Sequence, residues 1–190
     1  MVELIVFIAV VGTAVAGVLA ALTSATRSSG DALVRKQALA IAEAVLEEIQ
    51  LQPFTYCDPD DSQAATALSA TVGASGCNAT VEVIGVEGGE TRSGSPVGTP
   101  PIFDNVSDYD GYDSSIATPS GITFIDGTSI TGLDSYRVIV AVGGQPLETI
   151  GDDANSRPQS LLITVTVTGL ASTSVTLHGY RVRYVPNALP

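Results

Sequence analysis

The sequence predicts an α+β protein in which one long N-terminal helix packs against an antiparallel β-sheet. Three observations predict this fold class. Residues 4–22 form an uncharged apolar run, residues 32–51 are rich in helix-forming residues, and the chain beyond residue 80 contains short β-rich segments bounded by Gly, Pro, Asn and Asp. The chain has 190 residues, which is enough for one domain with an ordinary core.

Composition and charge exclude several classes of protein. The chain is 45% hydrophobic and 15% charged, which excludes disorder driven by low hydrophobicity and high charge. It has 20 acidic and 8 basic residues, a net charge of −12, so it cannot form the basic face of a duplex-binding protein, and we expect no nucleic-acid partner. One His and two Cys leave little for a His/Cys metal centre.

The apolar run at residues 4–22 is long enough to cross a bilayer as a helix. A secretory signal peptide is the alternative interpretation. It is disfavoured because Glu3 stands where a basic segment is expected, because the run is longer than a usual signal-peptide core, and because a second helical segment follows. The first part of the chain is therefore predicted to be buried in lipid or in other protein.

The second helical segment, residues 32–51, is amphipathic. Its apolar residues fall largely on one stripe, which consists of Leu33, Val34, Leu39, Ile41, Val45, Leu46 and Ile49. The simplest arrangement is one helix from near residue 2 to Gln52, ended by Pro53. This divides the chain into a helix at 1–52, with an apolar half at 1–22 and an amphipathic half at 32–52, and a β-rich globular domain at 53–190.

Two regions of the long helix are predicted to be weak. Residues 23–30 are mostly Ser and Thr and end at Gly30, all poor helix formers. Gly12 and Gly17 would permit close approach of another chain or local unwinding, although ordinary membrane-helix composition is the favoured explanation for them. Any break in the helix is expected at 23–30 or around Gly12–Gly17, and not in 32–52.

The globular part alternates between β-rich segments and turn residues. Ile163, Val165 and Val167 are predicted to face the core, whereas Arg181 and Arg183 are predicted on the exposed face. No helical segment separates the later strands, so the sheet is predicted to be antiparallel and to cover the stripe of the 32–52 helix. The predicted strands are 81–84, 122–125, 136–142, 161–168, 174–177 and 180–185.

Cys57 and Cys77 enclose 19 residues and are the only cysteines. In a cytosolic protein they would be free thiols. The membrane segment and the scarcity of basic residues indicate a location outside the cytoplasm, where we expect them to form a disulfide.

Catalytic and cofactor sites find little support. Asp104, Asp108, Asp110 and Asp113 have a calcium-like spacing but lack the Glu of an EF-hand loop, so a solvated acidic loop is favoured, and no metal or cofactor is predicted. His178 is the only His, and no nucleophile elbow, phosphate loop or zinc motif occurs. The chain is therefore not expected to be an enzyme.

Glu3 is an acid at the head of an apolar run, which is costly to bury unpaired. Two interpretations remain open. It lies at headgroup level near a helix N-terminus, where the macrodipole favours negative charge, or it requires a positive partner when the helix packs into an assembly.

The segment from Met1 to Ile8, followed by a Gly-interrupted apolar run and a long helix, resembles the N-terminus of type IV pilins and pseudopilins, whose mature form begins Phe-Thr-Leu-x-Glu-Leu. Val2-Glu3-Leu4 matches the end of that motif. Residues 35–43, 54–60 and 161–167 resemble the MshD-like prepilins of the mannose-sensitive haemagglutinin pilus system. The resemblance covers most of the chain and implies a type IV pilin-like fold.

The resemblance also implies a role for the N-terminus. In the family this Glu neutralises the N-terminal amine of a neighbouring subunit in the filament core, and the mature N-terminus is methylated. The role falls on Glu3, with Met1 at the position of the amine. The family's Glu lies four residues after the mature N-terminus, whereas two residues precede Glu3, which leaves the mature N-terminus open.

The function implied is that of a structural subunit of an extracellular type IV pilus-like filament, with an acidic β domain on its surface. The implied partners are further copies of the chain, the inner-membrane pilus assembly machinery and, before assembly, the inner membrane. Two alternatives are a minor pilin that primes or tips the filament and a monomeric membrane-anchored domain that binds an extracellular ligand.

Overall fold

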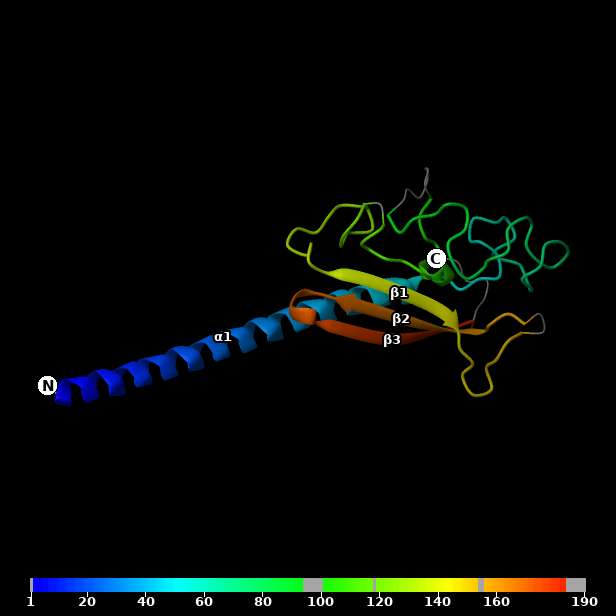
Figure 1. Ribbon diagram of the computed structural model, residues 1–190. Helices are drawn as coiled ribbons and strands as arrows, with labels where there is room; N and C mark the ends of the chain where they lie inside the picture. Colours follow the sequence, from blue (N-terminus) through cyan, green and yellow to red (C-terminus); the bar gives the residue numbers. More distant parts are fainter. Residues whose placement is uncertain (1, 94–100, 118, 154–155, 184–190) are drawn as a thin grey trace.

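The computed structural model describes residues 2–93, 101–117, 119–153 and 156–183, apart from the side chains of 27–29. Its elements follow one another in the order α1, η1, β1, β2, η2, β3. The helix α1 projects far beyond the globular part, so that its N-terminal end lies away from the rest of the chain (Figure 1). The predicted α+β class, with a long N-terminal helix and an antiparallel sheet, is confirmed.

The helix α1 is continuous from Val2 to Leu51. It ends one residue before Gln52, whose N–H bonds to the carbonyl of Ile49 at 3.1 Å, because Pro53 can neither donate a hydrogen bond nor fit the next turn. The predicted break at 23–30 or at Gly12–Gly17 is absent, and that prediction is wrong for this structure.

The threonine hydroxyls in the two regions predicted to be weak bond within the helix. Thr26 Oγ1 donates to the carbonyl of Leu22 at 2.6 Å, and Thr13 Oγ1 donates to the carbonyl of Ala9 at 3.0 Å. These hydroxyls bond to the preceding turn of the helix instead of drawing the backbone out of it. A stretch of weak helix formers therefore bridges two strongly helical segments without a break.

The sheet contains β1 (Arg137–Gly144), β2 (Ser160–Thr168) and β3 (Ser174–Val182) in that order, with both neighbouring pairs antiparallel. Val165 in the central strand pairs with Val140 on one side and Leu177 on the other. The short 3-10 helix η2 (Leu170–Ser172) connects β2 to β3. The predicted segment 174–177 and the first part of 180–185 join into one strand, which continues through His178 and Gly179 and ends at Val182; residues 184 and 185 of the prediction lie outside the described residues.

The two earlier predicted strands, 81–84 and 122–125, are not strands of the sheet. Each makes one isolated bridge, Cys57 with Val81 and Thr123 with Ser129. Glycines in the left-handed region turn the chain soon afterwards, at Gly85 with φ +104° and at Gly127 with φ +82°. These turns stop the pairing before a ladder can extend.

One face of the sheet packs on the second half of α1, as predicted. The inward side chains alternate along each strand, and Ile163, Val165 and Val167 are fully buried, which confirms their predicted orientation. The helix stripe is only partly as predicted, because Leu33 and Leu39 are 59% and 37% exposed. The stripe that is buried consists of Ala38, Ala42, Val45 and Ile49, with Val34, Ile41 and Leu46 partly buried beside it.

Arg181 and Arg183 do not lie on the exposed face. They continue the inward alternation of Val175, Leu177 and Gly179 beyond the last turn of α1, where the chain presents polar groups. Arg181 donates to the carbonyl of Gln52 at 3.0 Å. Arg183 donates to the carbonyl of Phe54 at 3.3 Å and lies 3.8 Å above the Phe54 ring. Both guanidinium groups therefore hold the segment that follows α1.

The loops between Pro53 and β1 lie at the C-terminal end of α1 (Figure 1). Their buried centre is the 3-10 helix η1 (Val106–Tyr109), which Asn105 caps by accepting from Ser107 N–H. Phe103 and Tyr109 meet edge-to-face at 5.0 Å. A smaller cluster around the cysteines contains Cys57, Ala64, Ala67 and Cys77.

Candidate functional site

The first candidate site is the apolar half of α1. All its described side chains are exposed, including Leu4, Phe7 and Leu19. The helix is long and apolar enough to span a membrane, and nothing else in the described chain covers that segment. An apolar surface of this extent is stable only when lipid or other protein covers it.

Glu3 lies exposed in the first turn of α1. No hydrogen bond or ion pair joins it to another of the described residues, and the dipole of α1 favours a negative charge at this end of the helix. Met1, the other residue implied in assembly, lies outside the described residues. A Cβ atom added at Gly12, Gly17 or Gly30 would meet nothing within 4 Å, so no contact within the chain requires these glycines. Their predicted role in flexibility stays a prediction.

A second apolar surface lies beside the covered half of α1. It is a groove of about 630 Å³ between the helix and the loop 122–133. Its lining includes Ala40, Ala44, Leu51, Phe124, Ile125 and Leu133. Phe124 and Ile125 are about half exposed, so this surface is also open to a partner.

Arg92 and Glu48, which form an ion pair, are among the residues that line this groove. Arg92 bonds to both carboxylate oxygens of Glu48, at 2.8 Å through Nε and at 2.6 Å through Nη2. Tyr109 Oη donates to Glu48 Oε1 at 2.8 Å, and Arg92 Nη1 donates to the carbonyl of Thr123 at 3.0 Å. These bonds connect α1 to the loops, and they occupy the guanidinium group of Arg92.

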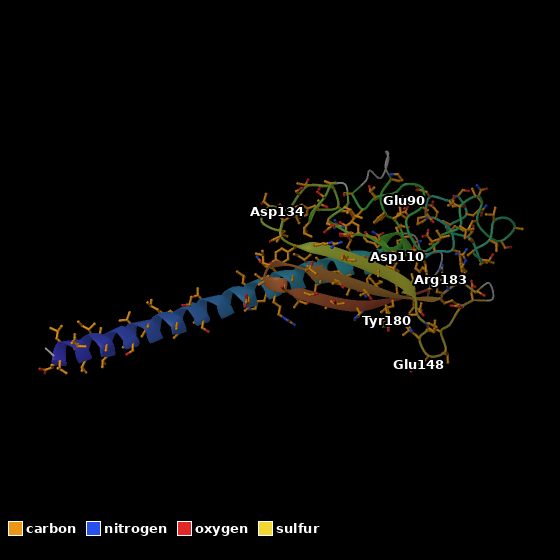
Figure 2. The ribbon with its side chains drawn as sticks, in the orientation of Figure 1. Glu90, Asp110, Asp134, Glu148, Tyr180 and Arg183 are labelled. Carbon is orange, nitrogen blue, oxygen red and sulfur yellow. A yellow bond between two sulfur atoms is a disulfide. The ribbon has the colours of Figure 1, made fainter. Side chains whose placement is uncertain are left out.

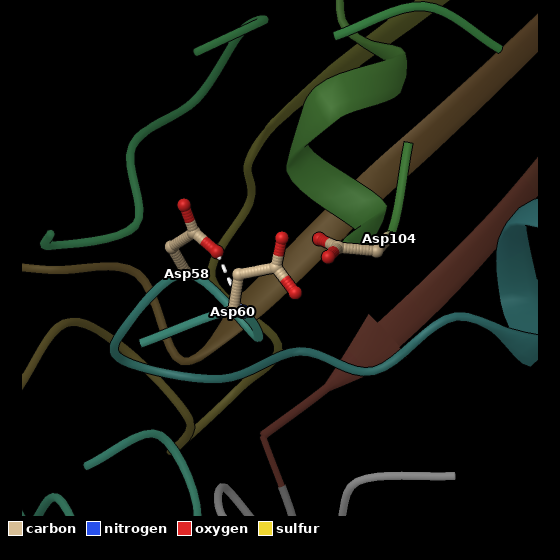
Figure 3. A group of neighbouring side chains, drawn as sticks. All are labelled: Asp58, Asp60 and Asp104. Atoms are coloured by element: carbon tan, nitrogen blue, oxygen red, sulfur yellow. Dashed lines mark hydrogen bonds between the residues drawn. The ribbon is translucent and has the colours of Figure 1, made fainter. Parts of the chain in front are cut away.

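The third candidate is a cluster of seven carboxylates in the loops next to η1, which we call the carboxylate cluster. The cluster contains three groups of three carboxylates, and within each group one oxygen of every member lies within 4.8 Å of the others. Figure 3 shows one group, in which the carboxyl groups of Asp60 and Asp104 face each other and Asp58 accepts the N–H of Asp60 at 2.7 Å. The cluster consists of Asp58, Asp60, Glu82, Glu87, Glu90, Asp104 and Asp108.

The structure brings together only two of the four acids that the sequence singled out. Asp104 and Asp108 belong to the carboxylate cluster. Asp110 instead accepts the N–H of Val142 at 2.8 Å, and Asp113 forms an ion pair with Arg137, so both face β1. The 3-10 helix η1 ends at Tyr109 and Asp110 is extended (φ −65°, ψ 126°), so the chain leaves the cluster between Asp108 and Asp110.

Burial and mutual repulsion raise the pKa values of Glu82, Glu90, Asp104 and Asp108 in the carboxylate cluster. Burial, and then the charge of Asp108, raise the pKa of Glu90 to about 8 and that of Asp104 to about 7. Burial raises the pKa of Asp108 to about 6 although the N–H groups of Asn105 and Asp104 oppose it. The pKa of Glu82 rises to about 10, chiefly through burial. The cluster is thus costly to ionise without a counter-charge.

Sequence reasoning missed Asp58, Asp60, Glu82, Glu87 and Glu90 as members of this cluster. They come from two segments, 58–60 and 82–90, and no local spacing links these segments to each other or to Asp104 and Asp108. The only available signal was the excess of acids over bases in residues 53–190. Their meeting is a product of the loop fold.

Cys57 and Cys77 form a disulfide with Cα atoms 5.4 Å apart, as expected, and no free cysteine remains. The neighbouring Asp61 accepts the N–H groups of Asn78, Ala79 and Thr80 at 2.7–3.0 Å, which fixes the loop beside the disulfide. His178 lies exposed in β3 with its Nδ1 3.1 Å from Thr164 Oγ1.

Comparison with known proteins yields no assignment: no family model, curated protein or solved structure matches this chain. The function is therefore argued from the uncovered apolar half of α1, the groove beside its covered half and the carboxylate cluster.

Proposed function

We propose that the chain is a structural subunit of an extracellular type IV pilus-like filament, in which it polymerises through the apolar half of α1 and displays its acidic β domain. The observation that carries the proposal is that one helix is uncovered on all sides over its apolar half and covered by its own sheet over the other half. A core of parallel helices would cover the first half and leave the globular part outside.

Glu3 favours an assembly over a simple anchor. In a bundle of copies its carboxylate is buried, and an ion pair with a neighbouring N-terminal amine would satisfy it in only one axial register. The repeated heterologous contact that results does not close, so it extends into a helical polymer. The sequence resemblance to type IV pilins supports this role for Glu3.

The apolar groove supports the same function. Ala40 and Ala44 line the groove from the side of α1, and Phe124 and Ile125 line it from the side of the loop 122–133. The groove therefore adds an apolar surface beside the covered half of the helix. A neighbouring copy of α1 is the occupant that we propose for it. A monomeric anchor would have no need of an apolar surface outside the bilayer.

In this proposal the chain has a structural and not a catalytic role. The apolar half of α1 holds it in the inner membrane before assembly. The pilus assembly machinery then transfers it into the extracellular filament, where lipid is exchanged for other copies of the same helix.

The test is to produce the full chain in a bacterium that carries a type IV pilus assembly machinery. Surface filaments are purified and imaged, and their main protein band is sequenced. We expect this chain to be the main band. Its presence only in traces beside another main subunit would overturn the major-subunit role in favour of a minor pilin, and its retention in the membrane fraction would overturn the filament altogether.

A matched pair of variants locates the contact. Val10 in the apolar half and Val72 in the loops are 61% and 62% exposed. Val10→Asp places a charge in the bundle and is expected to abolish filaments, whereas Val72→Asp is expected to leave them. Filaments from Val10→Asp at the wild-type yield would contradict the proposal.

A further inference from the structure

The carboxylate cluster has no role in the proposed polymerisation, and among the described residues no ion pair joins its acids to a basic side chain. The ion pairs among the described residues join Arg92 to Glu48 and Arg137 to Asp113, and neither includes an acid of the cluster. Arg157 approaches Glu82 only through the backbone, by donating to its carbonyl at 3.1 Å. Arg183 acts on the charge of Glu82, but among the described residues no basic side chain forms an ion pair with Glu90, Asp104 or Asp108.

Three carboxylate oxygens in the cluster, one each from Glu87, Glu90 and Asp108, are buried without a hydrogen-bond partner among the described residues. Glu90 is 8% exposed and Asp108 is 1% exposed. Glu90 Oε2 and Asp108 Oδ1 have no hydrogen-bond partner among the described residues. A buried ionised oxygen of this kind is costly unless an ion or a donor meets it.

The backbone orients Asp108 toward this place. Asp108 Oδ2 accepts the N–H of Asn105 at 2.7 Å and that of Asp104 at 2.9 Å. These two bonds fix one oxygen of the carboxylate at the start of η1. The other oxygen, Oδ1, is left free to act as a ligand in a fixed position.

We propose that Glu90, Asp104 and Asp108 bind one Ca²⁺ ion. One ligand oxygen from each of them lies within 4.8 Å of the others. A Ca²⁺ ion holds its oxygens at about 2.3–2.6 Å, so two ligands on opposite sides of the ion are separated by up to about 5 Å. The spacing therefore suits an ion placed between the three carboxylates.

The donor set selects a hard cation. All three ligands are carboxylates, which suit Ca²⁺ and Mg²⁺ rather than Zn²⁺, which prefers nitrogen and sulfur ligands. Mg²⁺ requires shorter bonds and near-octahedral geometry, whereas Ca²⁺ accepts irregular sets of oxygens. Asp104 is also shared with Asp58 and Asp60 (Figure 3), so further carboxylate oxygens are close to the same ligand.

The experiment uses the full chain in detergent micelles, stripped with a chelator and titrated with CaCl₂ or MgCl₂ by calorimetry. We expect one Ca²⁺ per chain, with Mg²⁺ at least tenfold weaker. Saturation should raise Tm by roughly 3 °C or more, because the ion binds only the folded state. Absence of binding at millimolar Ca²⁺, or equal affinity for Mg²⁺, would overturn the proposal.

Glu90→Gln is the diagnostic variant and Glu148→Gln is its control. Figure 2 places Glu90 among the loops next to β1, whereas Glu148 is exposed on the loop that follows β1. Glu90→Gln should bind Ca²⁺ at least tenfold more weakly, and without Ca²⁺ it should be at least as stable as the wild type, because it removes a buried charge. Glu148→Gln should behave as the wild type in both measurements.

Asp104→Asn keeps the proposal testable if Glu90→Gln does not fold. It should weaken Ca²⁺ binding to a similar extent. Wild-type Ca²⁺ affinity in either variant would overturn the assignment of the ligands. So would a Glu90→Gln protein that is less stable than the wild type in the absence of Ca²⁺, since that result would indicate a purely structural acid.

Discussion

The two halves of α1 share one backbone but differ in what covers them. Over residues 4–22 every side chain is exposed, and over 32–51 a stripe from Ala38 to Ile49 is buried under the sheet. Both halves are uninterrupted helix. Helical backbone is therefore no guide to how a segment is stabilised.

The difference follows from the distribution of apolar residues around the helix. A stripe on one side can be satisfied by one sheet, because a sheet presents one apolar face. A segment that is apolar on all sides needs neighbours on all sides, which its own chain does not supply. Changes in the first half should therefore affect assembly, whereas changes in the second half should affect folding.

The largest expected effect is on assembly, from Glu3→Ala. Removing one member of a buried ion pair costs roughly 3–5 kcal/mol, so filament yield should fall by well over tenfold. The β domain should keep its Tm, because Glu3 contacts none of it. Yield is measured from sheared surface filaments and Tm from near-UV circular dichroism.

Glu43→Ala is the control for that change, since Glu43 is exposed on the covered half of the same helix and does not line the groove. It should leave both the yield and Tm near the wild-type values. A Glu3→Ala protein that forms filaments at full yield would show that assembly does not depend on an ion pair of Glu3.

Ile49→Ala should have the largest effect on folding. Ile49 is fully buried in the core between α1 and the sheet, and its truncation should lower the free energy of unfolding by about 2–5 kcal/mol. Leu39→Ala removes an apolar side chain that is partly exposed on the same helix, and it should cost far less. Urea denaturation of both variants measures the two losses of stability. Equal losses would contradict the distinction between buried and exposed positions on the second half of α1.

The paired change Cys57→Ser and Cys77→Ser tests the loops that follow α1. Opening the disulfide should lower the free energy of unfolding by roughly 3 kcal/mol, because the unfolded chain gains freedom over a sequence separation of 20 residues. Amide exchange of β1–β3 should report the same loss if loops and sheet unfold together. Loss of protection confined to residues 53–93 would instead show that the sheet and α1 form an independent unit.

The smallest expected effect concerns the closest contact between β3 and α1. A Cβ atom at Gly179 would lie 2.6 Å from Gln50 Nε2 and 2.9 Å from Leu46 Cδ1. Gly179→Val should therefore cost roughly 1–3 kcal/mol through overpacking. Gly143→Val is the matched control in β1, where an added Cβ would meet nothing within 4 Å. Equal stability of the two variants in thermal unfolding would show that the helix can move away from the sheet.

Local pattern was sufficient for the regular elements. The apolar run and the helical composition of 32–51 predicted α1, and Pro53 predicted its end. The alternation from Leu161 to Thr168 predicted the central strand and its buried face. Each of these signals acts within a few residues, through propensity, sterics or period, so the sequence contains them in readable form.

The errors occurred where distant residues compete for the same place. The stripe of α1 is centred on Ala38 and Ala42 and not on Leu33 and Leu39, because small side chains let the helix approach the sheet. Leu39 lies about 100° around the helix from Ala38 and so misses that contact. Arg183 faces inward because its guanidinium group lies over the rings of Phe54 and Tyr56. These partners are far from Arg183 in the sequence, so no local pattern could predict the contact.

The sequence by itself determined the long helix, its apolar and amphipathic halves, the antiparallel class of the sheet and the pairing of Cys57 with Cys77. Only the tertiary structure decided which acids meet. Asp108 faces Glu90 across the loops, whereas Asp110, two residues later, bonds to β1. The physical reason is that propensity and periodicity act over a few residues, whereas the convergence of carboxylates depends on how whole loops fold over one another.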